Sequence, residues 1–255
     1  EVFPNLEVLF SVGAGVDQLN LSSVPENVRI VRMMEPGLAE GMIEYVLWAV
    51  LSYHRDMFRY ARQQAEHIWE GTPNISARHF RVGVMGMGAL GSPVLEKLSE
   101  LGYVCSGWSR KRHEVPGITS YAGAEELDAF LASTDILICL MPLTEETKGI
   151  LNRQLFGKLP DGACLINCGR GGHLVQEDLL WALDTGKIKQ AILDVTDPEP
   201  LPEQHPFWKH PLIFLTPHIA SSSRVDSGGE MILKNIIRYQ KNDRMLGEID
   251  RSTGY

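Results

Sequence analysis

The chain has 255 residues, of which 44% are hydrophobic, and it carries a formal net charge of −8. This length can bury one large core or two smaller ones, and the acidic balance argues against a nucleic-acid-binding surface, which would be basic. No apolar run without charges reaches the roughly 18 residues that a membrane span requires.

The first part of the chain contains two predicted strands and a long helical stretch. Leu6 to Val12 is a predicted buried strand, and the small residues at 13–17 follow it. Their backbone N–H groups suit a carboxylate, although an ordinary strand-to-helix turn fits equally well. Val28 to Met33 is a second strand. The apolar spacing from Leu38 to Trp69 predicts a helical stretch, which ends at the breaker residues 70–73.

A glycine pattern follows the next strand. The apolar run Val82 to Met85 leads into Gly86, Gly88 and Gly91, and a helical pattern comes next. This order of strand, tight turn and helix is the context that a dinucleotide-binding fingerprint requires. The exposed N–H groups at the start of the helix favour phosphates.

The strand after this helix ends in a basic turn. An NAD-binding chain usually places a carboxylate here for the ribose 2′-hydroxyl. This chain has Ser109, Arg110, Lys111 and Arg112 instead. The missing acid and the added cations favour NADP, and a solvated basic turn is the alternative.

From residue 81 the chain alternates strands and helices, which indicates a parallel sheet. The predicted strands are Val82–Met85, Val104–Trp108, Ile136–Met141, Ala163–Asn167, Ala191–Val195 and Ile213–Thr216. The predicted helices lie near Leu90–Leu101, Ala124–Leu131, Asn152–Leu159 and Gln176–Thr185. We therefore predict a doubly wound α/β sheet with its ligands at the carboxyl ends of the strands.

The cysteines lie in or beside the predicted buried strands, and their spacing matches no metal site. They are Cys105, Cys139, Cys164 and Cys168. Buried cysteines of this kind are typical of a protein kept reduced. We therefore expect a cytoplasmic protein without a metal centre.

Three of the predicted strands are followed by residues that can do chemistry. Arg170 lies among glycines, Glu199 lies between two prolines, and His218 follows Thr216-Pro217. An Arg can bind a carboxylate with its planar fork, and a His can give a proton to a carbonyl oxygen. A Glu bonded to the other ring nitrogen would fix the tautomer and favour the protonated imidazole. Taken singly, each could be a surface cap, a turn residue or a packed loop histidine.

Together these motifs resemble the D-isomer-specific 2-hydroxyacid dehydrogenases. The resemblance rests on the glycine turn and on four further segments in order. These are Leu140-Met141-Pro142-Leu143-Thr144 with Thr147 and Gly149, Asn167-Cys168-Gly169-Arg170-Gly171, Asp194-Val195 with Glu199-Pro200, and Thr216-Pro217-His218-Ile219-Ala220. The Gly13–Asp17 segment and the Ser109-Arg110 turn are similar to the branch that reduces glyoxylate and hydroxypyruvate.

The resemblance implies an NADPH-dependent reduction of small 2-oxo acids, with Arg170, Glu199 and His218 as the catalytic set. It implies that the substrate carboxylate is held by the amides of Ala14 and Gly15, with Arg170 and His218 beside it. The implied cofactor contacts are Gly86, Gly88, Ala89, Leu90, Gly91, Ser109, Arg110, Lys111, Leu140, Met141, Pro142, Thr147, Cys168, Gly169, Asp194 and Ala220.

The family also suggests an organisation. We expect a dinucleotide-binding domain at 38–220, and a discontinuous substrate domain at 1–37 and 221–255 that lacks the family's first strand–helix units. The 38–69 arm implies a homodimer, and the resemblance leaves open whether Trp69 enters the partner's site. Two other functions stay open: an NAD(H)-sensing binding module of the same fold, and another NADP oxidoreductase.

Overall fold

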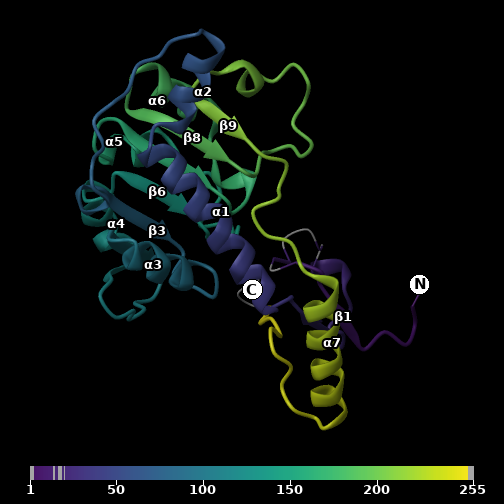
Figure 1. Cartoon of the computed structure of the whole chain (residues 1–255). Coiled ribbons are helices and arrows are strands. Elements are labelled where there is room, and N and C mark those ends of the chain that lie inside the picture. The colour runs from purple at the N-terminus through teal and green to yellow at the C-terminus, as the bar shows by residue number, and fades with distance from the viewer. Residues whose placement is uncertain (1–2, 14, 17–18, 20, 252–255) are drawn as a thin grey trace. The chain divides into compact units, whose positions relative to one another are not determined.

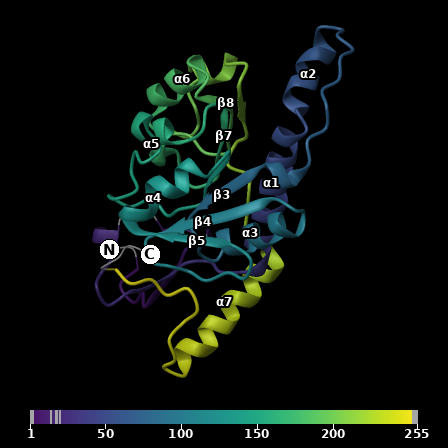
Figure 2. The same ribbon diagram turned by 90° about the vertical axis from the view of Figure 1, so that its left-hand side faces the viewer.

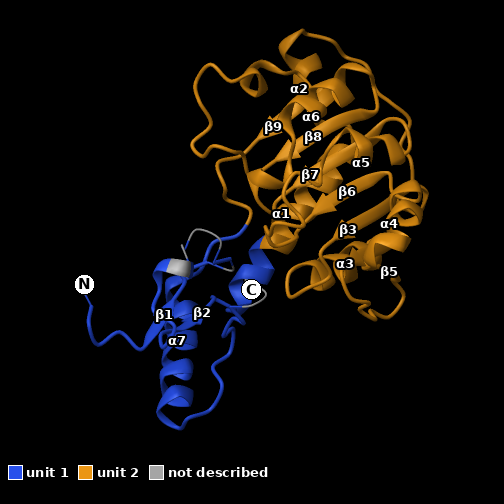
Figure 3. Cartoon of the chain, turned by 180° about the vertical axis from the view of Figure 1, so that it is seen from behind, with its two compact units in different colours: residues 1–41, 221–255 blue, residues 42–220 orange. Residues whose placement is uncertain are grey.

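The computed structural model describes residues 3–13, 15–16, 19 and 21–251 (Figure 1). The chain divides into two compact units (Figure 3), one made of residues 1–41 and 221–255 and the other of residues 42–220. The larger unit contains a seven-stranded sheet, and the smaller unit contains a two-stranded sheet. None of the described helices combines the length and the apolar composition needed to cross a membrane.

The sheet of the larger unit is parallel throughout. Its order is β5-β4-β3-β6-β7-β8-β9. The strands are β3 (Arg81–Met85), β4 (Val104–Ser109), β5 (Thr119–Ala122), β6 (Ile136–Cys139), β7 (Ala163–Asn167), β8 (Ile188–Leu193) and β9 (Ile213–Leu215). The order reverses between β3 and β6, which is where such sheets bind ligands. The predicted doubly wound fold is therefore confirmed.

Helices cover both faces of this sheet (Figure 2). They are α1 (Pro36–His54), α3 (Gly91–Glu100), α4 (Gly123–Ala132), α5 (Arg153–Lys158) and α6 (Gln176–Asp184), with short 3-10 turns at η2 (Ala77–His79), η3 (Gly171–His173) and η4 (Pro206–Lys209). Alternate strand residues face opposite cores, because successive side chains of a strand point to opposite faces. Ile138 packs in the core with α1 and α3, whereas Leu137 packs with α4, α5 and α6.

The prediction of one helical stretch from Leu38 to Trp69 is wrong. Helix α1 ends at His54, and α2 (Met57–Ala65) begins after Asp56, whose φ is 54°. The chain beyond α2 turns back, and the Thr72 N–H donates to the Tyr60 hydroxyl at 2.9 Å. The Thr72 hydroxyl also donates to the Asp56 carboxylate at 3.4 Å, so this segment contacts the break, which no Gly or Pro in the sequence indicates.

Strand β5 is a second difference, because the sequence predicts six strands in this region. Its residues, Thr119-Ser120-Tyr121-Ala122, are polar or small and pair only with β4 at the edge of the sheet. A short edge strand buries little apolar surface, so it leaves no clear hydrophobic pattern in the sequence.

The smaller unit pairs β1 (Val8–Phe10) with β2 (Arg29–Val31) in parallel, with η1 (Leu21–Ser23) between them and α7 (Val225–Gln240) beside them. Its core contains Val16, Ile30 and Ile249. Residues from the start and the end of the chain thus share one core.

A buried carboxylate, Glu35, ties two helix starts together within this unit. It is 2% exposed and accepts hydrogen bonds from the Gly37 amide at 2.9 Å, the Arg224 amide at 3.0 Å and the Ser227 hydroxyl. These donors lie at the N-termini of α1 and α7, where a negative charge is favourable. Burial alone would raise the pKa of Glu35, but the hydrogen bonds from Ser227, Arg224 and Gly37 outweigh it and lower the pKa.

We expect Glu35→Gln to reduce the free energy of unfolding at pH 7 by about 1–3 kcal/mol, because it leaves buried donors poorly matched. A carboxyl group whose pKa is lowered by folding stabilises the folded protein at pH values above its ordinary pKa of 4.5. This stabilisation is lost as the pH falls through the lowered pKa. Urea denaturation should therefore show the difference between wild type and variant shrinking below about pH 4.

The matched control is Glu40→Gln, since Glu40 is exposed and pairs with Arg224 at the surface. This control substitution should change the free energy of unfolding by less than about 1 kcal/mol. A Glu35→Gln variant as stable as this control would show that the Glu35 carboxylate does not stabilise the starts of α1 and α7.

Candidate active site

The glycine turn lies at the switch point of the large sheet. Gly86 follows β3 with a φ of 106°, and its N–H donates to the Trp108 carbonyl at the end of β4. A Cβ on Gly91 would lie 1.9 Å from the Gly86 carbonyl oxygen. Only glycine therefore allows α3 to begin so close to the end of β3.

The turn leaves a cradle open for a phosphate. A Cβ on Gly88 would meet nothing within 4 Å. Among the residues that the structure describes, no acceptor is found for the amide N–H groups of Gly88, Ala89 and Leu90. Exposed donors at the start of a helix fit a pyrophosphate.

The basic turn follows β4 beside this cradle, since Trp108 pairs with Met85. Ser109 donates through its hydroxyl to the Lys111 carbonyl at 2.6 Å, and Arg110 and Lys111 are exposed. Arg112 differs, because its guanidinium pairs with Glu126 and donates to the Ser120 carbonyl. All three cations of the turn are exposed, and Arg112 is held by Glu126 and Ser120.

The other predicted cofactor contacts lie at the ends of β6 and β7. Leu140, Met141 and Pro142 follow β6, and the Thr147 hydroxyl donates to the Pro142 carbonyl at 2.8 Å. Cys168 and Gly169 follow β7, where the Cys168 thiol is buried. Burial and nearby Asp194 raise the pKa of Cys168, so it stays a neutral thiol.

Two buried polar residues hold the backbone of Arg170. The Asn167 amide donates to the Arg170 carbonyl at 3.2 Å, and its oxygen accepts from the Gly169 N–H. The His173 ring is fully buried, with Nε2 3.2 Å from the Pro142 carbonyl and Nδ1 3.0 Å from the Arg170 N–H. Nδ1 also lies 3.1 Å from the Arg170 carbonyl, but only a hydrogen on Nε2 lets the ring donate to Pro142 and accept from the Arg170 N–H at the same time, so we assign the hydrogen to Nε2.

Glu199 and His218 form a hydrogen-bonded pair. His218 Nδ1 lies 2.8 Å from Glu199 Oε2, while Glu199 Oε1 accepts from the Thr196 N–H at 2.9 Å. The side chains are 44% and 38% exposed, so the pair is open to solvent on one side. The carboxylate can only accept, and Nδ1 therefore carries a hydrogen and Nε2 faces away from Glu199.

The loop of Arg170 packs directly against the loop that carries Glu199. A Cβ on Gly171 would lie 2.0 Å from the backbone carbon and oxygen of Thr196. Since β7, β8 and β9 are neighbours in the sheet, the residues after them share one edge. The structure thus brings together the three segments that the sequence singles out.

The remaining predicted site residues are divided between the units. Asp194 and Ala220 meet in the larger unit, where the Ala220 N–H donates to the Asp194 carboxylate at 2.9 Å. Gly15 lies in the smaller unit, where its carbonyl accepts from the Ser11 hydroxyl at 2.8 Å. Ala14 lies outside the described residues. The roles of Gly15 and Ala14 in binding substrate stay predictions.

Sequence reasoning missed several residues that support the site. Asn167 and Thr216 belong to predicted motifs but have no predicted role, and His173 and Tyr45 are not singled out. For His173 a signal existed, because it is a histidine three residues after Arg170 in a glycine-rich turn. For Tyr45 none existed, since its partner Thr216 is 171 residues away.

A doubly wound parallel sheet with an open glycine turn at its switch point defines a dinucleotide-binding domain. Residues 47–220 match the family model described as D-isomer specific 2-hydroxyacid dehydrogenase, NAD binding domain. The chain belongs to this family of dehydrogenases, and the resemblance in the sequence is confirmed.

Solved structures agree with this assignment. A family member from Klebsiella pneumoniae 342 is 40% identical, with a TM-score of 0.93, covering 98% of this chain and 80% of that chain. A family member from Xanthobacter autotrophicus Py2, in complex with NADPH and MES, is 36% identical, with a TM-score of 0.96, covering 99% and 80%. The NADPH-dependent glyoxylate/hydroxypyruvate reductase of Sinorhizobium meliloti, in complex with NADP and sulfate, is 37% identical, with a TM-score of 0.95, covering 100% and 83%.

Proposed function

We propose that this protein reduces small 2-oxo acids, glyoxylate and hydroxypyruvate among them, to 2-hydroxy acids with NADPH. The Glu199–His218 pair at 2.8 Å is the observation that carries the proposal, because it presents a proton donor at the ligand edge of the sheet. The similarity to the S. meliloti reductase supports this choice of substrates.

In this proposal each of the three residues has a separate task. Arg170 binds the substrate through its carboxylate and carbonyl oxygens, as a planar guanidinium can. His218 gives the proton on Nε2 to the carbonyl oxygen. Glu199 holds Nδ1–H and stabilises the charged imidazole. NADPH, when bound, supplies the hydride.

The residues around the glycine turn fit this cofactor. The amides of residues 88–90, for which the described part of the chain offers no acceptor, would receive its pyrophosphate. Exposed Arg110 and Lys111 would meet the 2′-phosphate, and no carboxylate stands in the turn at 109–112 to favour NAD. Two of the similar structures contain NADPH or NADP, which supports the same preference.

His218→Ala should lower kcat for glyoxylate by about 10²–10⁴ while leaving NADPH affinity nearly unchanged. Glu199→Gln should also lower kcat, because the charge that holds Nδ1–H and stabilises the charged imidazole is gone. Steady-state kinetics with glyoxylate and titration with NADPH test both expectations. An unchanged kcat in His218→Ala would assign the proton to another group.

Arg110→Ala should weaken NADPH binding about ten- to a hundredfold, as expected for a lost hydrogen bond between charged groups. NADH binding should change little. Fluorescence titration with both cofactors measures the difference. The matched control is Arg112→Ala, because the Arg112 guanidinium is already paired with Glu126. An equal loss in the two variants would show that Arg110 does not read the 2′-phosphate.

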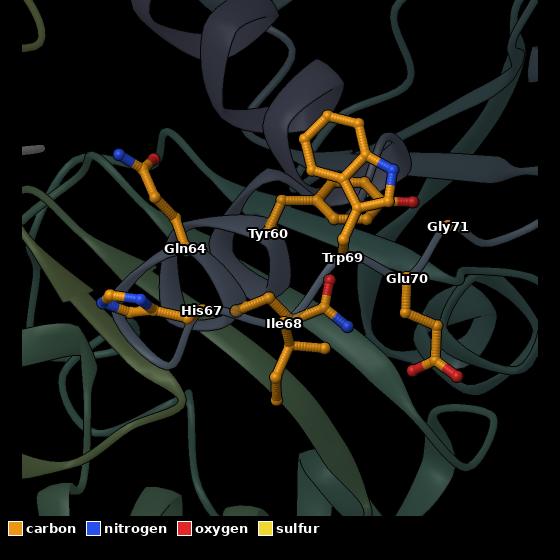
Figure 4. Close-up of a pocket in the computed structure, with 8 residues that line it drawn as sticks. Tyr60, Gln64, His67, Ile68, Trp69, Glu70 and Gly71 are labelled. Carbon is orange, nitrogen blue, oxygen red and sulfur yellow. The ribbon is translucent and has the colours of Figure 1, made fainter.

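We further propose a homodimer formed through the segment after α1, as the family resemblance implies. The Trp69 side chain is fully exposed, at 102%, and Ile68 and Ile75 are about half exposed. A hollow of about 740 Å³ is lined by α2 and the following loop (Figure 4). Its lining residues are Tyr60, Gln63, Gln64, His67, Ile68, Trp69, Glu70 and Gly71. An exposed apolar patch of this kind marks an interaction site.

In sedimentation velocity we expect the wild type to be a dimer and the double variant Ile68→Asp, Trp69→Ala to shift towards monomer. Trp208→Ala is the control, because Trp208 is also exposed but lies in η4, outside the hollow. A wild-type monomer, or a double variant that stays dimeric, would remove this segment as the interface.

A further inference from the structure

A chain of hydrogen bonds runs from helix α1 to the loop that carries His218. The Tyr45 hydroxyl lies 2.6 Å from the Thr216 hydroxyl. The Thr216 hydroxyl in turn donates to Asp194 Oδ1 at 2.6 Å. All three residues lie in the larger unit, and none of them contacts the Glu199–His218 pair through its side chain in the described contacts.

Asp194 is the point where this chain meets the backbone of the loop. Its carboxylate is 2% exposed and accepts from the Ile219 N–H at 2.8 Å and the Ala220 N–H at 2.9 Å. Its backbone carbonyl accepts from the His218 N–H at 2.8 Å. One residue thus holds three consecutive amides of the loop.

The conformation of His218 needs such support. Its φ is 57°, in the left-handed region that few residues other than glycine adopt. Strained backbone of this kind persists only where the surroundings over-determine it. Because the ring direction depends on this backbone, whatever fixes Asp194 also fixes the approach of the imidazole.

The direction of the hydrogen bonds can be assigned. The single hydrogen of the Thr216 hydroxyl goes to the carboxylate, which can only accept. Tyr45 must therefore donate to Thr216. Burial raises the pKa of Tyr45, so its hydroxyl keeps that hydrogen throughout the working pH range.

We propose that Tyr45 and Thr216 are positioning residues for the proton donor. Tyr45 fixes the rotamer of Thr216, Thr216 orients the Asp194 carboxylate, and Asp194 holds residues 218–220 in the conformation that aims His218. This inference rests on the proposed role of His218 as the proton donor. Neither residue is assigned a contact with substrate, so their loss should affect turnover more than binding.

The test compares conservative variants on glyoxylate reduction. Thr216→Val removes the hydroxyl and should lower kcat about ten- to a hundredfold, or about 1.4–2.7 kcal/mol in activation free energy. Thr216→Ser keeps the hydroxyl and should restore kcat to within about threefold of wild type. Tyr45→Phe should lower kcat about three- to tenfold, with the KM for NADPH within about twofold.

Tyr53→Phe is the matched control. Tyr53 lies on the same helix, is also partly buried, and donates through its hydroxyl to the Gly162 carbonyl at 3.0 Å. This bond lies before the start of β7, away from the catalytic loop. A hydroxyl that merely stabilises the fold would give the same result in both tyrosine variants, so kcat should fall only in Tyr45→Phe.

A second measurement does not depend on turnover. Hydrogen exchange of the Ile219 and Ala220 amides, followed by NMR, should be at least about tenfold faster in Thr216→Val than in wild type or Tyr53→Phe. An active wild type with unchanged kcat in Thr216→Val, or an equal loss in Tyr53→Phe, overturns the proposal. A Thr216→Ser variant whose kcat stays as low as that of Thr216→Val also overturns the proposal. If Thr216→Val does not fold, the kcat of Tyr45→Phe decides the question.

The proposed function and the positioning role can be contradicted separately. A wild type that reduces no 2-oxo acid with either cofactor contradicts the proposed function. In that case the amide exchange still tests whether Thr216 orients Asp194, and unchanged exchange overturns the positioning role as well.

Discussion

The buried Asp194 carboxylate is the contact on which the arrangement of the site depends. It accepts the Thr216 hydroxyl and the Ile219 and Ala220 amides, all after β9, while the residue itself follows β8. A buried charge is costly unless hydrogen bonds compensate it, and here three donors do so. The same bonds that satisfy the carboxylate also fix the backbone of His218. The hydrogen bonds to Asp194 therefore both stabilise the loop and direct the His218 side chain.

The architecture could be predicted from the sequence because parallel strands carry a local signal. Buried runs such as Ile136–Cys139 are continuous and apolar, and the glycine turn after β3 marks the switch point. The break between α1 and α2 could not be predicted, since Asp56 adopts a φ of 54° without Gly or Pro. Strand β5 was missed because an edge strand of small and polar residues has no hydrophobic alternation.

The sequence predicts which residues lie in the site, but not which residues hold them in place. Arg170, Glu199 and His218 follow strands, and the rule that ligands bind at carboxyl ends places such residues together. Their supports come from partners that spacing cannot pair, as with Tyr45 and Thr216. The basic turn shows the same limit, because only the fold reveals that Arg112 pairs with Glu126, 14 residues further along the chain.

The close approach at Gly171 has a consequence for how this site can change. Its Cα lies so near the Thr196 backbone that any side chain would push the two loops apart. A substitution there would displace the segment leading to Glu199 along with that of Arg170. The two segments that carry the proposed substrate-binding and proton-handling residues therefore cannot shift independently of each other. Grafting new specificity onto this scaffold would require exchanging both loops together.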